Sequence, residues 1–237
     1  MKAVTEAQEY SVDDVRLYIV STPIGNYADM TIRALKTLEK VDCVICEEYK
    51  EVTRLLKFFG IEKDLISLNE HNEKKETDEI IKEILEGKSF ALVSDCGTPA
   101  FEDPGNLLIQ RCIEYGIKFE FIPGANSLLA GIVLSGFDIS RFYYIGFLSP
   151  KGDERKRQLS NLQKLDRVFA ILDAPYRLTA LLKDLEIYFP ERRIFVGFDL
   201  TMENERHFKG TPGEILGEIG DEKIKGEFVV IVDKNHK

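Results

Sequence analysis

The sequence contains no long apolar run, no tryptophan and only four cysteines. No stretch approaches the ~20 apolar residues that a membrane-spanning helix needs, so we expect no membrane segment. Residues 1–15 carry charges throughout and lack the hydrophobic block of a secretory signal. We interpret them as a short N-terminal extension, and we expect the protein to be cytoplasmic.

The cysteines and histidines lack the spacing of a metal site. Cys43 and Cys46 form a C-x-x-C pattern, but this pattern lies inside the apolar run Val41–Cys46. Residues three apart on a strand point to opposite faces, so one metal ion or one disulfide cannot easily use both thiols. We therefore predict buried thiols in a reducing compartment, and no metal site.

Positively charged residues are also outnumbered. The sequence has 32 Lys and Arg and 41 Asp and Glu, which gives a net charge of −9. This balance opposes nonspecific nucleic-acid binding by the whole surface. A local exception is a group of four cations: Lys151, Arg155, Lys156 and Arg157. The group fits the positioning of RNA phosphates and, equally well, the solvated face of a helix. We expect the preceding aromatic residues, Tyr143, Tyr144 and Phe147, to lie in the core.

Segments with strand and helix patterns alternate along the first half of the chain. Expected strands are 16–21, 41–46, 65–68, 90–94 and 117–122, and expected helices are 30–38, 53–59, 73–86 and 105–115. This alternation predicts a mostly parallel sheet with helices on both faces. The chain contains no sequence repeat and no low-complexity segment.

The second half of the chain shows a less regular α/β pattern. Expected strands are 142–146, 168–172, 194–198 and 227–232, and expected helices are 127–134, 154–163, 176–187 and 214–219. The last part lacks the βαβ rhythm, so we predict a mixed sheet. The sequence thus predicts two α/β domains, residues 16–122 and residues 123–237.

A polar loop follows the apolar run Phe90–Val93. It reads Ser94-Asp95-Cys96-Gly97-Thr98-Pro99, with Asp103-Pro104-Gly105 close behind. In open α/β sheets, ligands bind at the carboxyl ends of the strands. Glycine lets a backbone approach a ligand and proline stiffens the loop, although the same residues also suit an ordinary strand-to-helix turn.

Similar loops follow other expected strands, and together they favour a ligand site. They are Thr22–Asn26, Pro123–Ser127, Asp173–Arg177, Asp199–Thr201 and Lys225–Glu227. A Rossmann dinucleotide site is disfavoured, because no G-x-G-x-x-G follows the first strand.

In order and spacing, these loops resemble the tetrapyrrole-methylase superfamily of S-adenosylmethionine-dependent methyltransferases. Within it, the chain is most similar to the bacterial small-subunit rRNA ribose 2′-O-methyltransferases, which act on a cytidine. The resemblance runs from Leu17 to about Val232. It implies two α/β domains with the cofactor in the cleft between them, a homodimer, and small-subunit rRNA or the ribosomal subunit as partner.

The resemblance also implies which residues line the S-adenosylmethionine. From the first domain they are Pro23, Ser94, Asp95, Cys96, Gly97, Thr98, Pro99 and Asp103, and from the second Asn126, Ser127, Asp173, Leu200, Thr201, Gly226 and Glu227. Backbone groups and small residues of this kind can recognise adenine, ribose hydroxyls and the amino-acid carboxylate.

Methyl transfer to a ribose hydroxyl favours a general base, and Glu47 and Glu48 follow the second expected strand. Acidic residues at such places are more often solvated loop or helix N-terminal charges. The segments 47–54, 173–177 and 198–202 depart from the family pattern by the loss or exchange of several charged and polar groups. A relative that binds the cofactor without catalysis, or one that methylates a small tetrapyrrole, therefore stays an alternative.

Overall fold

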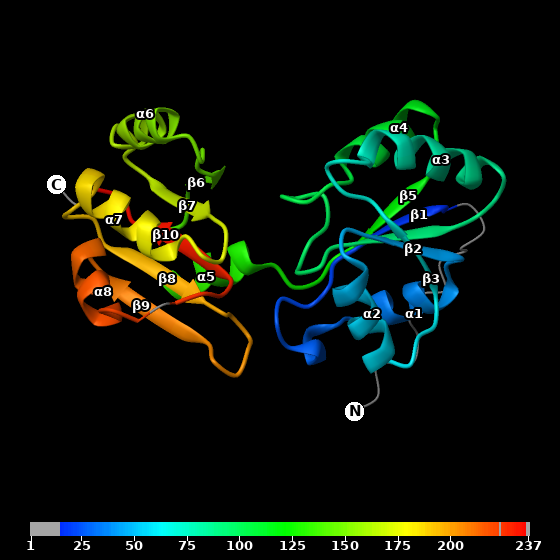
Figure 1. Ribbon diagram of the computed structural model, residues 1–237, viewed down its shortest axis with the longest axis horizontal. Helices are drawn as coiled ribbons and strands as arrows, with labels where there is room; N and C mark the ends of the chain where they lie inside the picture. The colour runs from blue at the N-terminus through cyan, green and yellow to red at the C-terminus, as the bar shows by residue number, and fades with distance from the viewer. Residues whose placement is uncertain (1–14, 223, 236–237) are drawn as a thin grey trace. The chain divides into compact units, whose positions relative to one another are not determined.

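The computed structural model describes residues 15–222 and 224–235, so the proposed N-terminal extension lies almost wholly outside the described residues. The described chain forms two compact units. The first comprises the segment up to Pro23 together with Tyr27–Ala125, and the second comprises Ile24–Asn26 and the chain from Asn126 onward. Each unit contains one five-stranded sheet with helices against it, which confirms the predicted α/β class (Figure 1).

The sheet of the first unit is entirely parallel. Its strand order is β3 (Asp64–Ser67), β2 (Cys43–Cys46), β4 (Phe90–Val93), β1 (Leu17–Val20) and β5 (Phe119–Ile122). β1, β2 and β4 are completely buried, as expected for parallel strands covered on both faces. The sequence prediction of a parallel sheet is confirmed.

Two pairs of helices cover the two faces of this sheet: α1 (Ile32–Lys40) with α2 (Tyr49–Phe58), and α3 (Glu73–Leu85) with α4 (Asn106–Glu114) (Figure 1). Cys46 packs in the cluster under α1 and α2, whereas Cys43 packs in the cluster under α3 and α4. The two thiols of the C-x-x-C pattern therefore point to opposite faces, as predicted. Burial raises the pKa of Cys43 to about 11 and that of Cys46 to about 12.

The sheet of the second unit is mixed, which confirms the prediction. Its order is β6 (Phe142–Phe147), β7 (Val168–Leu172), β10 (Phe228–Val232), β8 (Ile194–Phe198) and β9 (Arg206–Gly210). β6 and β7 are parallel, and the other three pairings are antiparallel. β9 was not predicted from the sequence, because Phe208 is its only large apolar residue.

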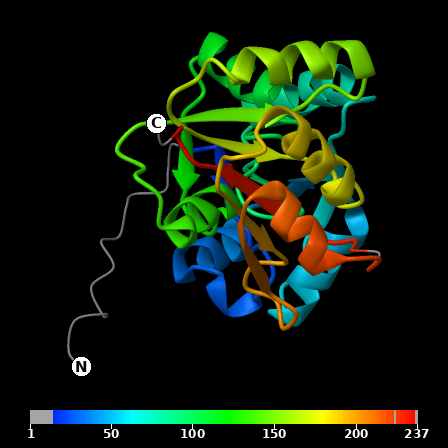
Figure 2. The same ribbon diagram turned by 90° about the vertical axis from the view of Figure 1, so that its left-hand side faces the viewer.

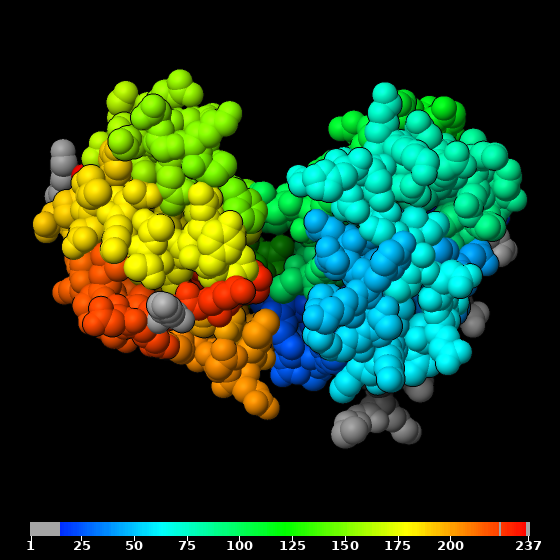
Figure 3. Space-filling view, in the orientation of Figure 1, coloured from blue at the N-terminus to red at the C-terminus, as the bar shows by residue number. Residues whose placement is uncertain are grey.

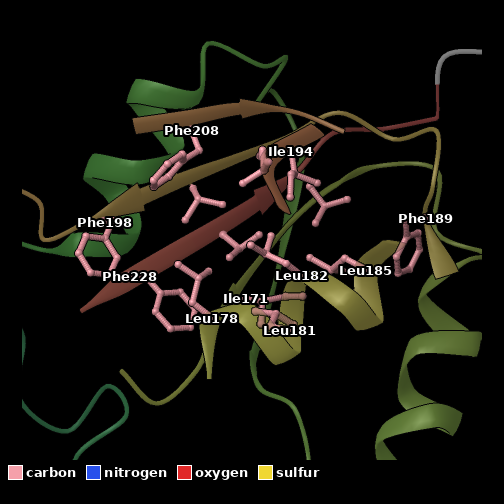
Figure 4. Packing of buried hydrophobic residues seen from close by; sticks show 14 of the residues in the cluster. Ile171, Leu178, Leu181, Leu182, Leu185, Phe189, Ile194, Phe198, Phe208 and Phe228 are labelled. Atoms are coloured by element: carbon pink, nitrogen blue, oxygen red, sulfur yellow. The ribbon is translucent and has the colours of Figure 1, made fainter. Parts of the chain in front are cut away.

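Four helices accompany this sheet: α5 (Ser127–Ser135), α6 (Gly152–Leu162), α7 (Leu178–Tyr188) and α8 (Pro212–Ile219). α7 and α8 lie in front of the strands in Figure 2. They share one apolar core with the sheet, in which Leu178 and Leu182 of α7 pack with Ile171 of β7 (Figure 4). α5 packs closely against β10 of the same sheet. A Cβ at Gly131 of α5 would lie only 3.3 Å from Cγ2 of Val229.

The aromatic residues of β6 differ from the sequence expectation. Tyr143 is 52% exposed and Phe147 is 47% exposed, and Tyr144 is half-buried. β6 is an edge strand, so fewer neighbouring residues cover it than cover β7 or β10. The expectation that these aromatic residues lie in the core is wrong for Tyr143 and Phe147.

None of the helices in residues 15–222 and 224–235 is long and apolar enough to cross a membrane.

Candidate functional site

In the first unit, the loops after β1 and β4 are joined at the carboxyl edge of the sheet. The Thr22 amide donates to the Gly97 carbonyl oxygen over 2.8 Å, and the Thr22 hydroxyl donates to the Ser94 carbonyl oxygen over 2.9 Å. The Gly97 amide in turn donates to Thr22 Oγ1 over 3.1 Å. Gly97 has a φ of +90°, a conformation that favours glycine. These bonds fix the loop that the sequence singles out.

Thr98 and Cys96 belong to the same loop. The hydroxyls of Ser21 and Thr98 lie 3.3 Å apart, and the Cys96 amide donates to Ser94 Oγ over 3.1 Å. Cys96 is the one exposed thiol among the described residues. Thr22, which the sequence analysis did not assign to the site, anchors this loop, although its place in the polar Thr22–Asn26 loop was a visible signal.

Four acidic residues gather along this edge, and we call them the acidic group: Glu47, Glu48, Asp95 and Asp103. The Glu48 amide donates to Asp95 Oδ1 over 3.3 Å, and Ser94 donates to the Asp103 carboxylate. Burial raises the pKa of Asp95 and of Asp103 above the ordinary value, and nearby acidic residues add to both effects. Burial likewise raises the pKa of Glu47, with further contributions from Asp103 and Asp95. The group therefore favours a cationic ligand.

Asp103→Asn should stabilise the first unit. The folded-state pKa of Asp103 is raised, so its ionised form costs stability at neutral pH, and this cost disappears as the pH falls through the folded pKa. We expect the variant to gain roughly 0.5 kcal/mol or more in free energy of unfolding at neutral pH. Denaturant unfolding at several pH values measures this gain, which should shrink on acidification. A variant that is less stable than the parent at neutral pH would contradict the assignment.

In the second unit, the end of β8 and the start of β10 form another polar group. The Asp199 amide donates to the Glu227 carbonyl oxygen over 2.7 Å, and the Glu227 amide donates to Asp199 Oδ1 over 2.8 Å. Asp199 and Thr201 have φ values of 47° and 68°, which is unusual for residues other than glycine. Burial raises the pKa of Glu227, and Asp199 adds to the rise.

Three further residues are hydrogen-bonded to this group. The Gly226 amide donates to the Pro175 carbonyl oxygen over 3.3 Å, which joins the loop after β7. The Asn26 amide donates to Thr201 Oγ1 over 3.0 Å, and Asn204 donates to Asp199 Oδ2 over 2.5 Å. We call Asp199, Leu200, Thr201, Gly226 and Glu227 the Asp199 group. Nothing in the local sequence signalled the part that Asn204 takes.

The side chain of Asp173, a residue expected at the cofactor site, is paired inside the protein. Its side chain is 0% exposed, and Oδ1 accepts from the Ala174 amide over 2.9 Å and from Arg177 Nη1 over 3.2 Å. Oδ2 accepts from Arg155 Nη1 over 3.2 Å. The carboxylate therefore faces two guanidinium groups inside the protein. Asn126, also expected at the site, uses its side chain to cap α5 by accepting from the Leu129 amide.

Arg155 likewise differs from the expectation of a surface cation. It is only 9% exposed, and its Nε donates to Asp184 Oδ2 over 2.6 Å. It lies one helical turn before Leu159, which is fully buried, so both residues are on the inward face of α6. The other members of the predicted RNA-binding group, Lys151, Lys156 and Arg157, are exposed. Figure 3 shows the yellow-green part of the chain, which includes α6, at the surface of the second unit.

Comparison with known proteins adds the family. A model described as Tetrapyrrole (Corrin/Porphyrin) Methylases matches residues 16–216, which is most of the chain. The chain belongs to the tetrapyrrole methylase family. Methyltransferases of this family use S-adenosylmethionine, so the chain is an S-adenosylmethionine-dependent methyltransferase. Over residues 15–222 and 224–235, no group of three or more His, Cys, Asp or Glu is placed to hold a metal ion.

Several curated relatives of this tetrapyrrole methylase carry the name ribosomal RNA small subunit methyltransferase I. The protein from Thermotoga maritima is 39% identical over 217 residues, which covers 92% of this chain and 97% of the relative. The protein from Bacillus subtilis is 36% identical over 217 residues, which covers 92% of this chain and 74% of the relative. The similarity thus includes both units.

Solved structures support the same fold. A diphthine synthase superposes with a TM-score of 0.75 at 16% identity, covering 93% of this chain and 90% of that chain. The uroporphyrin-III-C-methyltransferase of Thermus thermophilus superposes with a TM-score of 0.65 at 20% identity, covering 92% and 94%. At these identities the likeness shows the tetrapyrrole methylase fold alone.

The chemistry of both polar groups fits S-adenosylmethionine. This cofactor carries a sulfonium and an ammonium cation, which suit the partly buried carboxylates of the acidic group. It also carries hydroxyls, an adenine and a carboxylate, which suit backbone and hydroxyl groups such as those near Gly97 and Thr201. The residues of each unit therefore fit the cofactor that the family uses.

Proposed function

We propose that the protein methylates the 2′-hydroxyl of a cytidine ribose in small-subunit rRNA. The observation that carries this proposal is the near full-length similarity to relatives named ribosomal RNA small subunit methyltransferase I. In a strain that lacks the gene, mapping of 2′-O-methyl groups on the rRNA should show the loss of one modified cytidine. Unchanged rRNA modification would remove the substrate and leave a tetrapyrrole acceptor or a noncatalytic relative.

The cofactor, when bound, supplies a methyl group on a sulfonium centre. The acidic group of the first unit would balance its cationic parts, with Asp95 and Asp103 nearest in sequence to the glycine of the loop. The remaining proposed contacts are Pro23, Ser94, Cys96, Gly97, Thr98 and Pro99 in the first unit, and Asn126, Ser127 and the Asp199 group in the second. In this assignment Asp173 contributes through the turn that it holds.

Glu47 is the better of the two proposed general bases. It follows β2 at the edge where the β4 loop lies, and its pKa is raised by burial and by Asp103 and Asp95. A base whose pKa lies closer to the working pH accepts a proton from a poor nucleophile more effectively. Glu48 is exposed and stays the weaker candidate.

RNA would lie against the exposed cations of α6 and the residue before it. We expect simultaneous reversal of Lys151, Lys156 and Arg157 to Glu to weaken RNA binding and to flatten its salt dependence. Each lost phosphate contact should reduce the slope of log K against log salt concentration by about 0.7 for a single strand. Binding titrations at several salt concentrations measure this slope.

The matched control reverses three exposed lysines of α1 and α2, namely Lys36, Lys40 and Lys57. It introduces the same change in net charge in the first unit, so it separates a local RNA contact from a general loss of positive charge. Equal slopes for both triple variants would contradict the α6 assignment.

We infer a homodimer in the cytoplasm, where ribosomal RNA is modified. The support for the dimer is the family resemblance, and the support for the location is the name that the relatives carry. Light scattering coupled to size-exclusion chromatography should give twice the chain mass of 27.1 kDa. A mass equal to one chain would contradict the dimer.

A further inference from the structure

Arg155 makes contacts that a surface cation of α6 would not need. Its Nη1 donates to Asp173 Oδ2 over 3.2 Å, and its Nε donates to Asp184 Oδ2 over 2.6 Å. Asp173 follows β7, and Asp184 lies on α7. One buried guanidinium therefore ties α6 to the residue that follows β7 and to the middle of α7.

The turn at the end of β7 is held from the same carboxylate. Asp173 Oδ1 accepts from the Ala174 amide over 2.9 Å and from Arg177 Nη1 over 3.2 Å. With Arg155 bound to Oδ2, both carboxylate oxygens of Asp173 accept hydrogen bonds. The position of residues 174–177 thus depends on the orientation of one buried carboxylate.

This turn reaches the Asp199 group through one backbone hydrogen bond. The Pro175 carbonyl oxygen accepts from the Gly226 amide over 3.3 Å. Gly226 is packed tightly, because a Cβ there would lie 2.6 Å from Phe198 Cζ and 2.7 Å from Asp199 Oδ2. A displaced 173–175 turn would therefore move Gly226, and with it the backbone of the neighbouring Glu227.

We propose that Arg155 is a positioning residue for cofactor binding, which acts through Asp173 on the 173–175 turn and through that turn on Gly226. This inference rests on the proposed cofactor site of the second unit. A buried ion pair contributes little to stability compared with apolar residues of similar volume, so stability alone does not explain a cation at this place. The cation is explained by its role in orienting the Asp173 carboxylate, which holds the turn.

The test measures S-adenosylmethionine affinity by calorimetry on the full chain. Arg155→Met should raise the dissociation constant by roughly tenfold to a hundredfold, as expected when a supporting side chain lets a binding loop shift. Arg155→Lys should restore part of the affinity, because a lysine can reach one of the two carboxylates. Asp184→Asn removes one anchor of Arg155 without touching the turn, and it should give an intermediate loss.

The matched control is Arg192→Met. Arg192 is also a buried arginine of the second unit, at 7% exposed, but it contacts the Leu165 carbonyl and the rings of Phe169 and Phe189. Its replacement also removes a buried guanidinium from the second unit, but it should leave the dissociation constant of the cofactor unchanged. The comparison thus separates a positioning role from the general effect of replacing a buried arginine.

The outcomes are distinguishable. If the parent protein does not bind S-adenosylmethionine, the proposed function fails before the variants are compared. If the parent binds and both Arg155→Lys and Asp184→Asn, which keep most of the packing, bind with unchanged affinity, the positioning role is wrong even should Arg155→Met not fold. A salt slope of RNA binding that is flatter in Arg155→Met than in the parent would instead return Arg155 to the RNA surface.

Discussion

Glu47→Gln is expected to lower the maximal rate of methyl transfer by about 10²–10⁴-fold, the range typical of a lost general base. The affinity for S-adenosylmethionine should change little, because glutamine keeps the shape and one acceptor oxygen of glutamate. Single-turnover kinetics with rRNA, together with calorimetry, separate these two effects. The physical reason is the environment of Glu47, where burial and the charges of Asp103 and Asp95 raise its pKa.

The pH dependence of the methyl-transfer rate tests the same role of Glu47 independently. A general base works only when it is deprotonated, so the rate should fall as the pH drops through the pKa of Glu47. That pKa lies above the ordinary value of 4.5, so the fall should begin at a higher pH than an exposed glutamate would give. The residual activity of Glu47→Gln should lack this acidic limb.

Two other variants decide between the candidates. Glu48→Gln tests the weaker proposed base, and Glu39→Gln, on the exposed face of α1, controls for the loss of one negative charge. If Glu48→Gln alone abolishes the rate, the base is assigned to the wrong residue. If neither glutamate variant slows the reaction by more than the Glu39 control, the acidic group holds no general base.

Gly226→Ala is expected to raise the dissociation constant of S-adenosylmethionine by roughly a hundredfold, the loss that a shift of about 1 Å in a binding site can cause. The new Cβ would lie 2.6 Å from Phe198 Cζ and 2.7 Å from Asp199 Oδ2, well inside van der Waals contact. Asp199 or the backbone near Glu227 must therefore move. Overpacking of this kind should also cost about 1–3 kcal/mol of stability.

The control for this variant is Gly217→Ala on α8. No heavy atom lies within 4 Å of the Cβ that it would add, and alanine favours a helix by up to about 1 kcal/mol over glycine. It should therefore bind the cofactor as the parent does and be slightly more stable. Unchanged affinity in Gly226→Ala would mean that the Asp199 group does not form part of the cofactor site.

The fold of the first unit was predictable because its pattern is regular. Buried parallel strands such as Phe90–Val93 are continuous apolar runs, and the helices between them carry one apolar face. Element ends were less predictable. α2 begins at Tyr49, a turn before the expected Thr53, because its first residues are polar and carry no periodic apolar signal.

Charged residues of the second unit were harder to place. Arg155 and Arg157 look alike in the sequence, yet one is buried between Asp173 and Asp184 while the other is exposed. The spacing of Arg155 from Leu159 and Leu162 marks the inward face of α6, but the acidic partners come from distant parts of the chain. Pairing across such distances depends on the tertiary fold, so a local pattern cannot reveal it.

Transfer of a radiolabelled methyl group from S-adenosylmethionine to small-subunit rRNA tests the central claim most directly. The RNA should come from a strain that lacks the gene, and the labelled nucleosides should be separated after digestion. We expect label in 2′-O-methylcytidine, at a rate that Glu47→Gln and Gly226→Ala both lower. A protein that binds the cofactor but leaves the RNA and its nucleosides unlabelled would contradict it.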